Sequence, residues 1–154
     1  MTVKTFSIDE TIRVGERLAS LLNKGDIIAL IGDLGAGKTI FVKGLAKGLG
    51  IIEYNYVNSP TFTIIKEYNA RFPLYHFDVY RLDEHSFLDT IDYKKYFYSD
   101  GITVIEWADK IKDILPEKYL EIRIENIKEN ERKIDFLGHG KRYMDLVKNG
   151  QWAL

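Results

Sequence analysis

Gly32-Asp33-Leu34-Gly35-Ala36-Gly37-Lys38-Thr39 is the stretch that decides the fold of this chain. It matches the pattern G-x-x-x-x-G-K-[ST] in full, a glycine-rich loop that cradles the phosphates of a nucleotide. Glycines let the backbone approach phosphate oxygens without Cβ clashes, and the N–H groups of the loop point inward at the positive end of the next helix. Lys38 can place its charge on the β and γ phosphates, and the Thr39 hydroxyl is a ligand for Mg²⁺.

The residues on either side of this loop have the pattern that such a site requires. Ile27–Ile31 is a continuous apolar run, which is typical of a strand buried on both faces of a parallel sheet. Residues 38–49 predict a helix that Gly50 ends. A chance match is therefore a poor explanation, and we interpret the loop as a nucleoside triphosphate site.

The rest of the chain alternates strands with helices. We expect an edge strand over residues 2–6 and a helix over residues 10–23 with Asp9 as its N-cap. Further strands are predicted over residues 62–68, 74–80, 102–105, 120–125 and 133–137, and further helices over residues 83–97 and 107–115. The order of these elements predicts an α/β fold, a three-layer P-loop NTPase domain with a mixed, mainly parallel β-sheet flanked by helices. One domain is expected over residues 1–154, the last fifteen of which give only a weak pattern.

Composition excludes several classes of protein. The 23 acidic and 22 basic residues nearly cancel, which argues against a protein that grips nucleic acid by bulk charge. The absence of cysteine excludes disulfides, thiolate zinc sites and cysteine nucleophiles. The N-terminus has no apolar signal core, and no apolar run approaches the length of about 18 residues that a bilayer span needs. We therefore expect a soluble, cytoplasmic protein with no membrane partner.

Hydrolysis of a bound nucleotide needs an acidic group beyond the phosphate loop, to hold the metal or to orient water. Glu106 directly follows the apolar strand at residues 102–105, so it should emerge at the carboxyl edge of the sheet, where ligands bind in open α/β folds. Asp78 is the second candidate. The alternatives are a carboxylate that favours a helix N-terminus at Glu106, and a buried acid paired with Arg81 or a backbone donor at Asp78.

The residues that share a strand with Asp78 are better explained as packed side chains than as catalytic or ligand-binding ones. His76 and Tyr80 lie on the same strand face as Asp78 by the period of two. No second histidine at metal spacing accompanies His76, so we interpret it as a packed histidine. Tyr80 is interpreted as a core aromatic. For Trp107, packing near the nucleotide and filling of the core both stay open.

Asn23-Lys24-Gly25-Asp26 matches the guanine-reading pattern N-K-x-D. It precedes the phosphate loop, which is the wrong side for a GTPase. We interpret these residues as a turn that ends a helix, and ATP is therefore favoured over GTP.

Four motifs together resemble the TsaE (YjeE) family of small bacterial ATPases. They are the phosphate loop, Ser59-Pro60-Thr61-Phe62-Thr63, Tyr75-His76-Phe77-Asp78-Val79-Tyr80-Arg81-Leu82 and Ile105-Glu106-Trp107, in this order. The resemblance covers nearly the whole chain. It implies a role in making the threonylcarbamoyladenosine modification of tRNA, with ATP and Mg²⁺ as cofactors. It also implies action with the TsaB–TsaD heterodimer, which would carry most of the tRNA contact, and no transfer of the threonylcarbamoyl group by this chain itself.

The resemblance implies roles for single residues. Thr39 and Glu106 would hold the metal, and Lys38, Asp78 and Glu106 are the catalytic candidates. The residues expected to bind the nucleotide are Thr11, Asp33, Leu34, Gly35, Ala36, Gly37, Lys38, Thr39, Ile40 and Arg132, with Thr11 and Arg132 near the base or ribose. Residues 59–63 would form a mobile, switch-like segment. The chain departs from the family pattern at Ile40, where many members have a second Thr or Ser, and in the helix at residues 83–97, which lacks the expected central glycine.

Two other functions are compatible with a phosphate loop. A free-standing P-loop kinase of a small metabolite would usually carry an arginine-rich lid, whereas the arginines of this chain are scattered. A nucleotide-gated binding module would show negligible turnover. Phosphate release by the protein alone, and then with TsaB and TsaD, separates these alternatives from the main interpretation.

Overall fold

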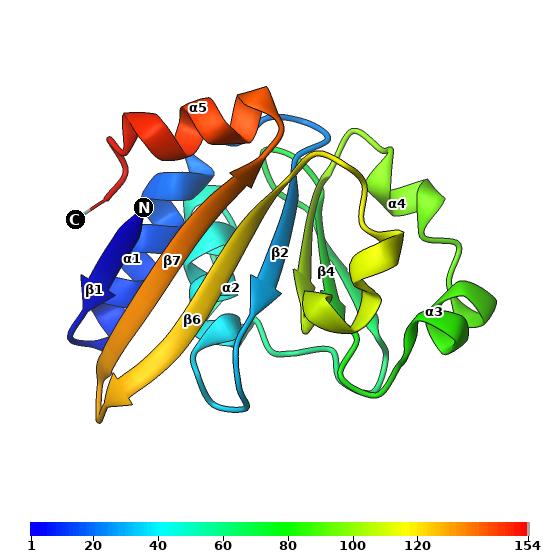
Figure 1. Ribbon diagram of the computed structural model, residues 1–154, viewed down its shortest axis with the longest axis horizontal. Coiled ribbons are helices and arrows are strands. Elements are labelled where there is room, and N and C mark those ends of the chain that lie inside the picture. The colour runs from blue at the N-terminus through cyan, green and yellow to red at the C-terminus, as the bar shows by residue number, and fades with distance from the viewer. Residues whose placement is uncertain (154) are drawn as a thin grey trace.

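A computed structural model defines the structure of residues 1–153, which form one sheet with helices on both faces (Figure 1). The strands are β1 (Thr2–Thr5), β2 (Ile27–Ile31), β3 (Ile65–Tyr68), β4 (Leu74–Asp78), β5 (Ile102–Glu106), β6 (Tyr119–Lys128) and β7 (Glu131–His139). The helices are α1 (Ile8–Ala19), α2 (Lys38–Gly48), α3 (Glu84–Thr90), α4 (Lys94–Phe97) and α5 (Lys141–Asn149), with 3₁₀ helices η1 (Tyr54–Tyr56) and η2 (Ala108–Ile114).

The strand order is β1-β7-β6-β2-β5-β4-β3. The four central strands, β6, β2, β5 and β4, run parallel, while β3 and β7 run antiparallel to their neighbours. The predicted mixed sheet is therefore confirmed, and β3 with β4 and β6 with β7 form antiparallel hairpins. The carboxyl ends of the central strands meet at one edge of the sheet, the lower edge in Figure 1, and the phosphate loop leaves β2 there.

Apolar side chains cover both faces of the sheet. On one face, Leu18 of α1 and Phe41 of α2 pack in the same cluster as Ile28 of β2. On the other face, Phe87 of α3 packs in a cluster with Phe77 of β4. Because β2 is buried on both faces, its continuous apolar run has a direct physical cause. Within residues 1–153, no helix is long and apolar enough to cross a membrane.

Helices α1 and α2 touch through glycine backbones. A Cβ atom on Gly44 would lie 2.3 Å from the carbonyl oxygen of Ile12, and one on Gly15 would lie 2.7 Å from that of Phe41. Both distances are shorter than real Cβ contacts, so only glycine permits this approach. This contact holds α2 against α1. It thereby sets the position of the N-terminus of α2, which directly follows the phosphate loop.

The N-cap of α1 differs from the prediction. Ser7, not Asp9, caps the helix, because its hydroxyl oxygen accepts a hydrogen bond from the N–H of Glu10 at 3.1 Å. The Glu10 carboxylate in turn accepts from the N–H of Phe6 at 2.7 Å. Together these bonds satisfy backbone donors in the manner of a capping box, so the helix begins two residues earlier than expected.

Two predicted elements in the middle of the chain are interrupted. The strand expected from residue 62 begins only at Ile65, because the preceding turn ends in Ile64 with φ of 70°. The helix expected over residues 83–97 divides into α3 and α4, because Ile91 has an extended backbone. Residues 107–115 are 3₁₀ rather than α-helical over most of their length. Residues 141–149 form α5, which the weak local pattern did not predict.

A buried carboxylate in the turn after α1 holds α5. Asp26 accepts hydrogen bonds from the guanidinium of Arg142 (Nε at 2.8 Å), the hydroxyl of Tyr143 (3.1 Å) and the N–H of Asn23 (2.7 Å). The Tyr143 oxygen also accepts from the N–H of Ile27 at 3.0 Å. The carboxylate that would read guanine is therefore used for packing. Residues 23–26 do form a turn, but they do not end the helix as expected, because α1 ends at Ala19 with Ser20 as its C-cap.

We predict that Asp26→Ala lowers the free energy of unfolding by about 2–4 kcal/mol, because it leaves the Arg142 and Tyr143 donors without their buried acceptor. Urea unfolding followed by circular dichroism measures this loss. The matched control is Asp145→Ala, which removes an exposed ion pair with Lys141 within α5 and should leave the urea midpoint nearly unchanged. Similar small losses in both variants would contradict the anchoring role of Asp26.

Candidate functional site

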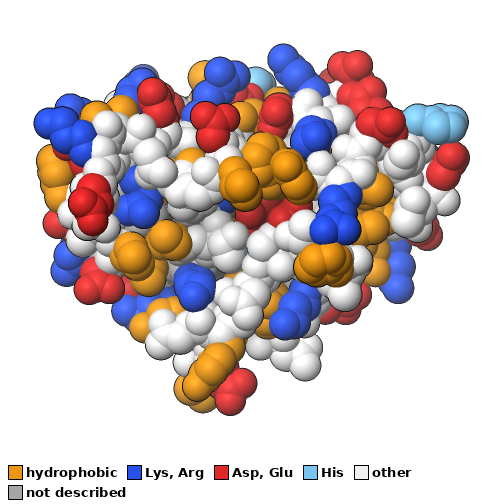
Figure 2. Space-filling view, turned by 90° about the horizontal axis from the view of Figure 1, so that it is seen from below, with side chains coloured by type: hydrophobic (Ala, Val, Ile, Leu, Met, Phe, Trp, Pro, Cys, Tyr) orange, Lys and Arg blue, Asp and Glu red, His pale blue; other side chains and the backbone are white. Residues whose placement is uncertain are grey.

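A pocket of about 320 Å³ opens at the carboxyl edge of the central strands. Figure 2 looks onto this edge and shows acidic side chains in a hollow beside a group of hydrophobic ones. The lining residues come from the phosphate loop, α2, the segment before β3, and the ends of β4 and β5: Leu34, Gly35, Gly37, Lys38, Thr39, Ile40, Ser59, Thr61, Asp78, Tyr80, Glu106 and Trp107. Most of the predicted site residues therefore do meet in one place.

The phosphate loop adopts backbone angles that favour glycine. Gly35 has φ of 76°, and Gly37, which caps α2, has φ of 114°. A Cβ atom on Gly37 would lie 2.7 Å from Nε of Arg132, which donates a hydrogen bond to the carbonyl of Ala36 at 3.1 Å. Arg132 is thus packed behind the loop and supports it.

The Lys38 amine is folded over its own loop. It donates to the carbonyl oxygens of Gly32 and Asp33, the second at 2.9 Å, and lies 3.7 Å from the ring centroid of Trp107. Burial lowers the pKa of this amine, while the nearby Glu106 carboxylate opposes that effect. The amine therefore lies at the mouth of the loop, and a phosphate group can replace the two carbonyl oxygens as its hydrogen-bond acceptors.

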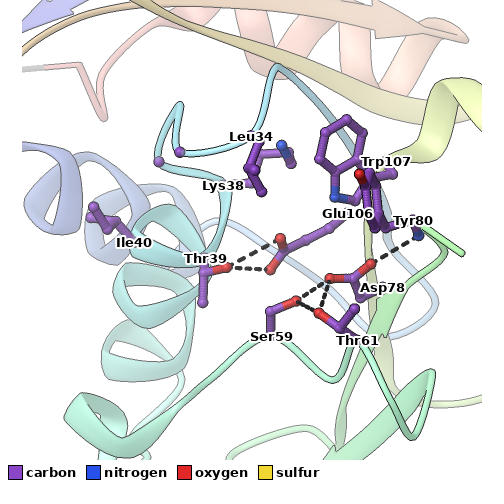
Figure 3. A pocket seen from close by; sticks show the side chains of 12 residues that line it. Leu34, Lys38, Thr39, Ile40, Ser59, Thr61, Asp78, Tyr80, Glu106 and Trp107 are labelled. Atoms are coloured by element: carbon purple, nitrogen blue, oxygen red, sulfur yellow. Dashed lines mark hydrogen bonds between the residues drawn. The ribbon is translucent and has the colours of Figure 1, made fainter.

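Glu106 faces the first turn of α2, as Figure 3 shows. It ends β5 on the same strand face as Val104, the face that α1 and α2 cover. Its side chain is 3% exposed, and both carboxylate oxygens accept from the Thr39 hydroxyl, at 2.9 and 3.1 Å. Nε2 of His76 lies 2.7 Å from Oε1 of the same carboxylate. The predicted emergence of Glu106 at the carboxyl edge is confirmed.

Asp78 lies beside Glu106, because the two residues are paired in the register of β4 and β5. Its carboxylate accepts from the hydroxyls of Ser59 and Thr61, the second at 3.1 Å (Figure 3). The alternative pairing with Arg81 is not what this structure contains, since that guanidinium stacks on Phe62 with 4.2 Å to the ring centroid. Asp78 therefore ties the segment before β3 to the sheet.

The interpretation of Tyr80 as a core aromatic is wrong. Strand β4 ends at Asp78, whose carboxylate accepts from the N–H of Tyr80 at 2.9 Å and turns the chain outward. Tyr80 is 44% exposed, and its ring packs against Trp107 at a tilt of 44° with 4.7 Å between ring centroids. Both rings line the pocket, so Trp107 packs at the site. An acidic residue two positions before an aromatic one is the signal that could have indicated this turn.

Four of the predicted nucleotide-binding residues do not line the pocket. Asp33 and Ala36 face a neighbouring hollow on the other side of the loop, and Arg132 lies behind it. Thr11 is fully buried, where its hydroxyl donates to the carbonyl of Ser7 and is also hydrogen-bonded to the hydroxyl of Thr5. The assignment of Thr11 and Arg132 to the base or ribose stays a prediction.

Comparison with known proteins gives one consistent result. A family model described as "Threonylcarbamoyl adenosine biosynthesis protein TsaE" matches residues 5–134. The chain is 45% identical over 146 residues to the tRNA threonylcarbamoyladenosine biosynthesis protein TsaE of Bacillus subtilis, which covers 94% of this chain and 90% of that protein. It is 41% identical to the protein of the same name from Treponema pallidum, over 83% of this chain and 93% of that one.

A solved structure agrees with these relatives. The crystal structure of Bacillus subtilis YdiB superposes with a TM-score of 0.81 at 39% sequence identity. The match covers 97% of this chain and 92% of that chain. The likeness therefore extends over the sheet, the phosphate loop and the strand ends that carry Asp78 and Glu106.

We predict that Gly37→Ala destabilises the protein more than Gly35→Ala does. Both substitutions place a Cβ on a residue with positive φ, at a cost of about 1–2 kcal/mol. Within the described chain, the new Cβ meets no atom within 4 Å at Gly35, whereas at Gly37 it displaces the Arg132 guanidinium. Urea unfolding should show an additional loss of about 1 kcal/mol or more for Gly37→Ala. Equal losses would mean that the contact with Arg132 does not stabilise the loop.

Proposed function

This chain belongs to the TsaE family, and from that premise we propose that it is the ATP-binding and ATP-hydrolysing protein of the machinery that makes threonylcarbamoyladenosine in tRNA. The observation that carries the proposal is the hydrogen bond of 2.9 Å between Thr39 and Glu106, at the mouth of a complete phosphate loop. It joins the two side chains that a P-loop ATPase uses beside the phosphates.

The phosphate loop supplies the binding step. Its N–H groups lie at the N-terminus of α2, where the helix dipole favours an anion. The Lys38 amine leaves the carbonyls of Gly32 and Asp33 and pairs with the β and γ phosphates instead. The exposed Leu34 and the ring of Trp107 form part of the rim around this position.

The side chains at the edge also fit Mg²⁺. The donors are the Thr39 hydroxyl and the Glu106 carboxylate, with Asp78 beside them, and all are hard oxygen ligands of the kind that this ion prefers. Bound together with the nucleotide, the ion would neutralise charge that develops on the phosphates. Thr39 and Glu106 are the residues that would hold it.

Hydrolysis needs a group that orients the attacking water. Asp78 and Glu106 both reach the pocket and are nearly fully buried, at 3% and 2% exposure. Ser59 and Thr61 are bonded to Asp78, so a change in these hydroxyls on phosphate binding is transmitted to that carboxylate. This arrangement supports a switch-like role for residues 59–63.

Partner proteins complete the proposal. The near balance of acidic and basic residues gives this chain little bulk attraction for tRNA, so contact with tRNA falls to the TsaB and TsaD type proteins. The chain then acts in a heteromeric complex, where ATP hydrolysis resets the complex between turnovers.

We predict that Lys38→Ala weakens ATP binding by about 10- to 100-fold, through loss of charge-assisted hydrogen bonds worth about 1.5–3 kcal/mol. Glu106→Ala should leave binding within about threefold and lower turnover by about 100-fold or more. Calorimetric titration with ATP and a phosphate-release assay measure the two effects. Lys43→Ala is the matched control, because this lysine lies on the same helix and bonds to the carbonyl of Asn55 outside the pocket.

Two outcomes would argue against these roles. Equal loss of ATP binding in the Lys38 and Glu106 variants would mean that Glu106 is mainly structural. If Lys43→Ala weakens ATP binding as strongly as Lys38→Ala does, the effect comes from the total positive charge of the protein and not from a contact made by Lys38.

Phosphate release is expected to be slow for the protein alone and to rise when TsaB and TsaD type proteins are added together. The physical reason is that the pocket above the two buried carboxylates opens at the protein surface, so a partner that covers it would exclude water from the bound phosphates. Transfer of phosphate to a small metabolite, with no effect of the partners, would instead identify a free-standing kinase.

A further inference from the structure

His76 is a buried titratable residue with no task in the function proposed so far. It lies in the middle of β4, where it is fully buried on the strand face that also carries Leu74 and Asp78. Its backbone neighbour on β5 is Val104. Leu74 and Val104 belong to the apolar core, so an imidazole at this position gives up contact with water and needs a reason.

The ring is bonded on one side only. Nε2 lies 2.7 Å from Oε1 of Glu106, and within residues 1–153 the buried Nδ1 has no hydrogen-bond partner. A carboxylate accepts hydrogen bonds, so Nε2 carries a hydrogen and donates it to Glu106. An apolar side chain would fill the same space without burying Nδ1, so packing alone does not account for a histidine here.

The bond to His76 reaches Glu106 from the neighbouring strand, β4. Oε1 accepts from Thr39 on the helix and from His76 on the neighbouring strand. The Thr39 hydroxyl can rotate and is also needed at the nucleotide, whereas the ring of His76 is fixed by the core around it. The ring is therefore the constant donor that selects one rotamer of the carboxylate.

We propose that His76 is a positioning residue, which donates Nε2–H to Glu106 and holds its carboxylate toward Thr39 and the phosphate loop. The contact itself is a property of the free protein. Its consequence for Mg²⁺ and turnover rests on the function proposed above. Hydrogen bonds from outside the ligand shell typically change metal affinity or activity by about 10- to 100-fold.

Two amide substitutions form a matched pair for the test. In His76→Gln the amide nitrogen reaches the place of Nε2 and can still donate to Glu106, whereas in His76→Asn it reaches only the place of Nδ1. Both variants bury one amide group, so the loss of stability from burying a polar group should be similar in the two. His76→Met removes the donor and keeps an apolar side chain of adequate size.

The first measurement needs no nucleotide. Nitrogen NMR of the imidazole in the free wild-type protein should show a hydrogen on Nε2, and Glu106→Ala should shift that signal. A ring with its hydrogen on Nδ1, or a signal unchanged by Glu106→Ala, would overturn the proposal. This result is independent of whether the protein hydrolyses ATP.

The second test compares two affinities in each variant. One is the apparent affinity of the ATP-loaded protein for Mg²⁺, and the other is the affinity for ATP when excess chelator removes Mg²⁺. His76→Asn and His76→Met should weaken Mg²⁺ binding by about 10- to 100-fold, and should leave ATP binding in excess chelator within about threefold of wild type. His76→Gln should retain most of the wild-type Mg²⁺ affinity. Wild-type Mg²⁺ affinity in His76→Met, or equal loss in the Gln and Asn variants, would overturn the role at the metal. Failure of the wild-type protein to bind ATP would refute the proposed function instead, and the NMR result would still decide the contact.

Discussion

The hydrogen bond between Thr39 and Glu106 is the interaction on which the rest of the site depends. It joins the first turn of α2 to the end of β5, and these two elements flank β2, from which the phosphate loop departs. The bond is possible because Glu106 projects to the face of the sheet that α2 covers, and because glycine contacts hold α2 close to α1. A strand shifted by one residue would turn the carboxylate to the other face.

The arrangement has an electrostatic consequence. Asp78 and Glu106 are neighbours in register and are both almost fully buried, so the structure holds two carboxylates where water is largely excluded. Hydroxyls of Ser59, Thr61 and Thr39 bond to them, and the Lys38 amine is the nearby cation whose own pKa burial lowers. A buried cluster of this kind contributes little to the stability of the fold, which is typical of groups kept for function.

Local contacts explain where the predicted elements and the observed ones differ. Ser7 accepts from an N–H in the first turn of α1, and Glu10 accepts from the N–H of Phe6 before the helix, so the cap lies earlier than a search for an acidic residue suggests. Ile64 adopts a left-handed backbone, which its β-branched side chain disfavours, and its carbonyl accepts from the N–H of Asp78. That bond links β4 to the turn, and no periodicity in the sequence could indicate it. The helix α5 likewise depends on the buried Asp26, from a turn more than a hundred residues away.

The sequence alone determined the phosphate loop, the strand before it, the helix after it and the emergence of Glu106 at the carboxyl edge. These features follow from local rules: glycine in positive φ, an apolar run of strand length, and a charge placed directly after it. Only the tertiary structure decided that Asp78 lies beside Glu106, that Tyr80 faces the pocket and that Arg132 supports the loop from behind. His76 is packed in the core, as predicted, but only the tertiary structure shows that it also touches the Glu106 carboxylate. Those contacts depend on the register between strands and on which face each helix covers, and neither is encoded in the spacing of residues within one segment.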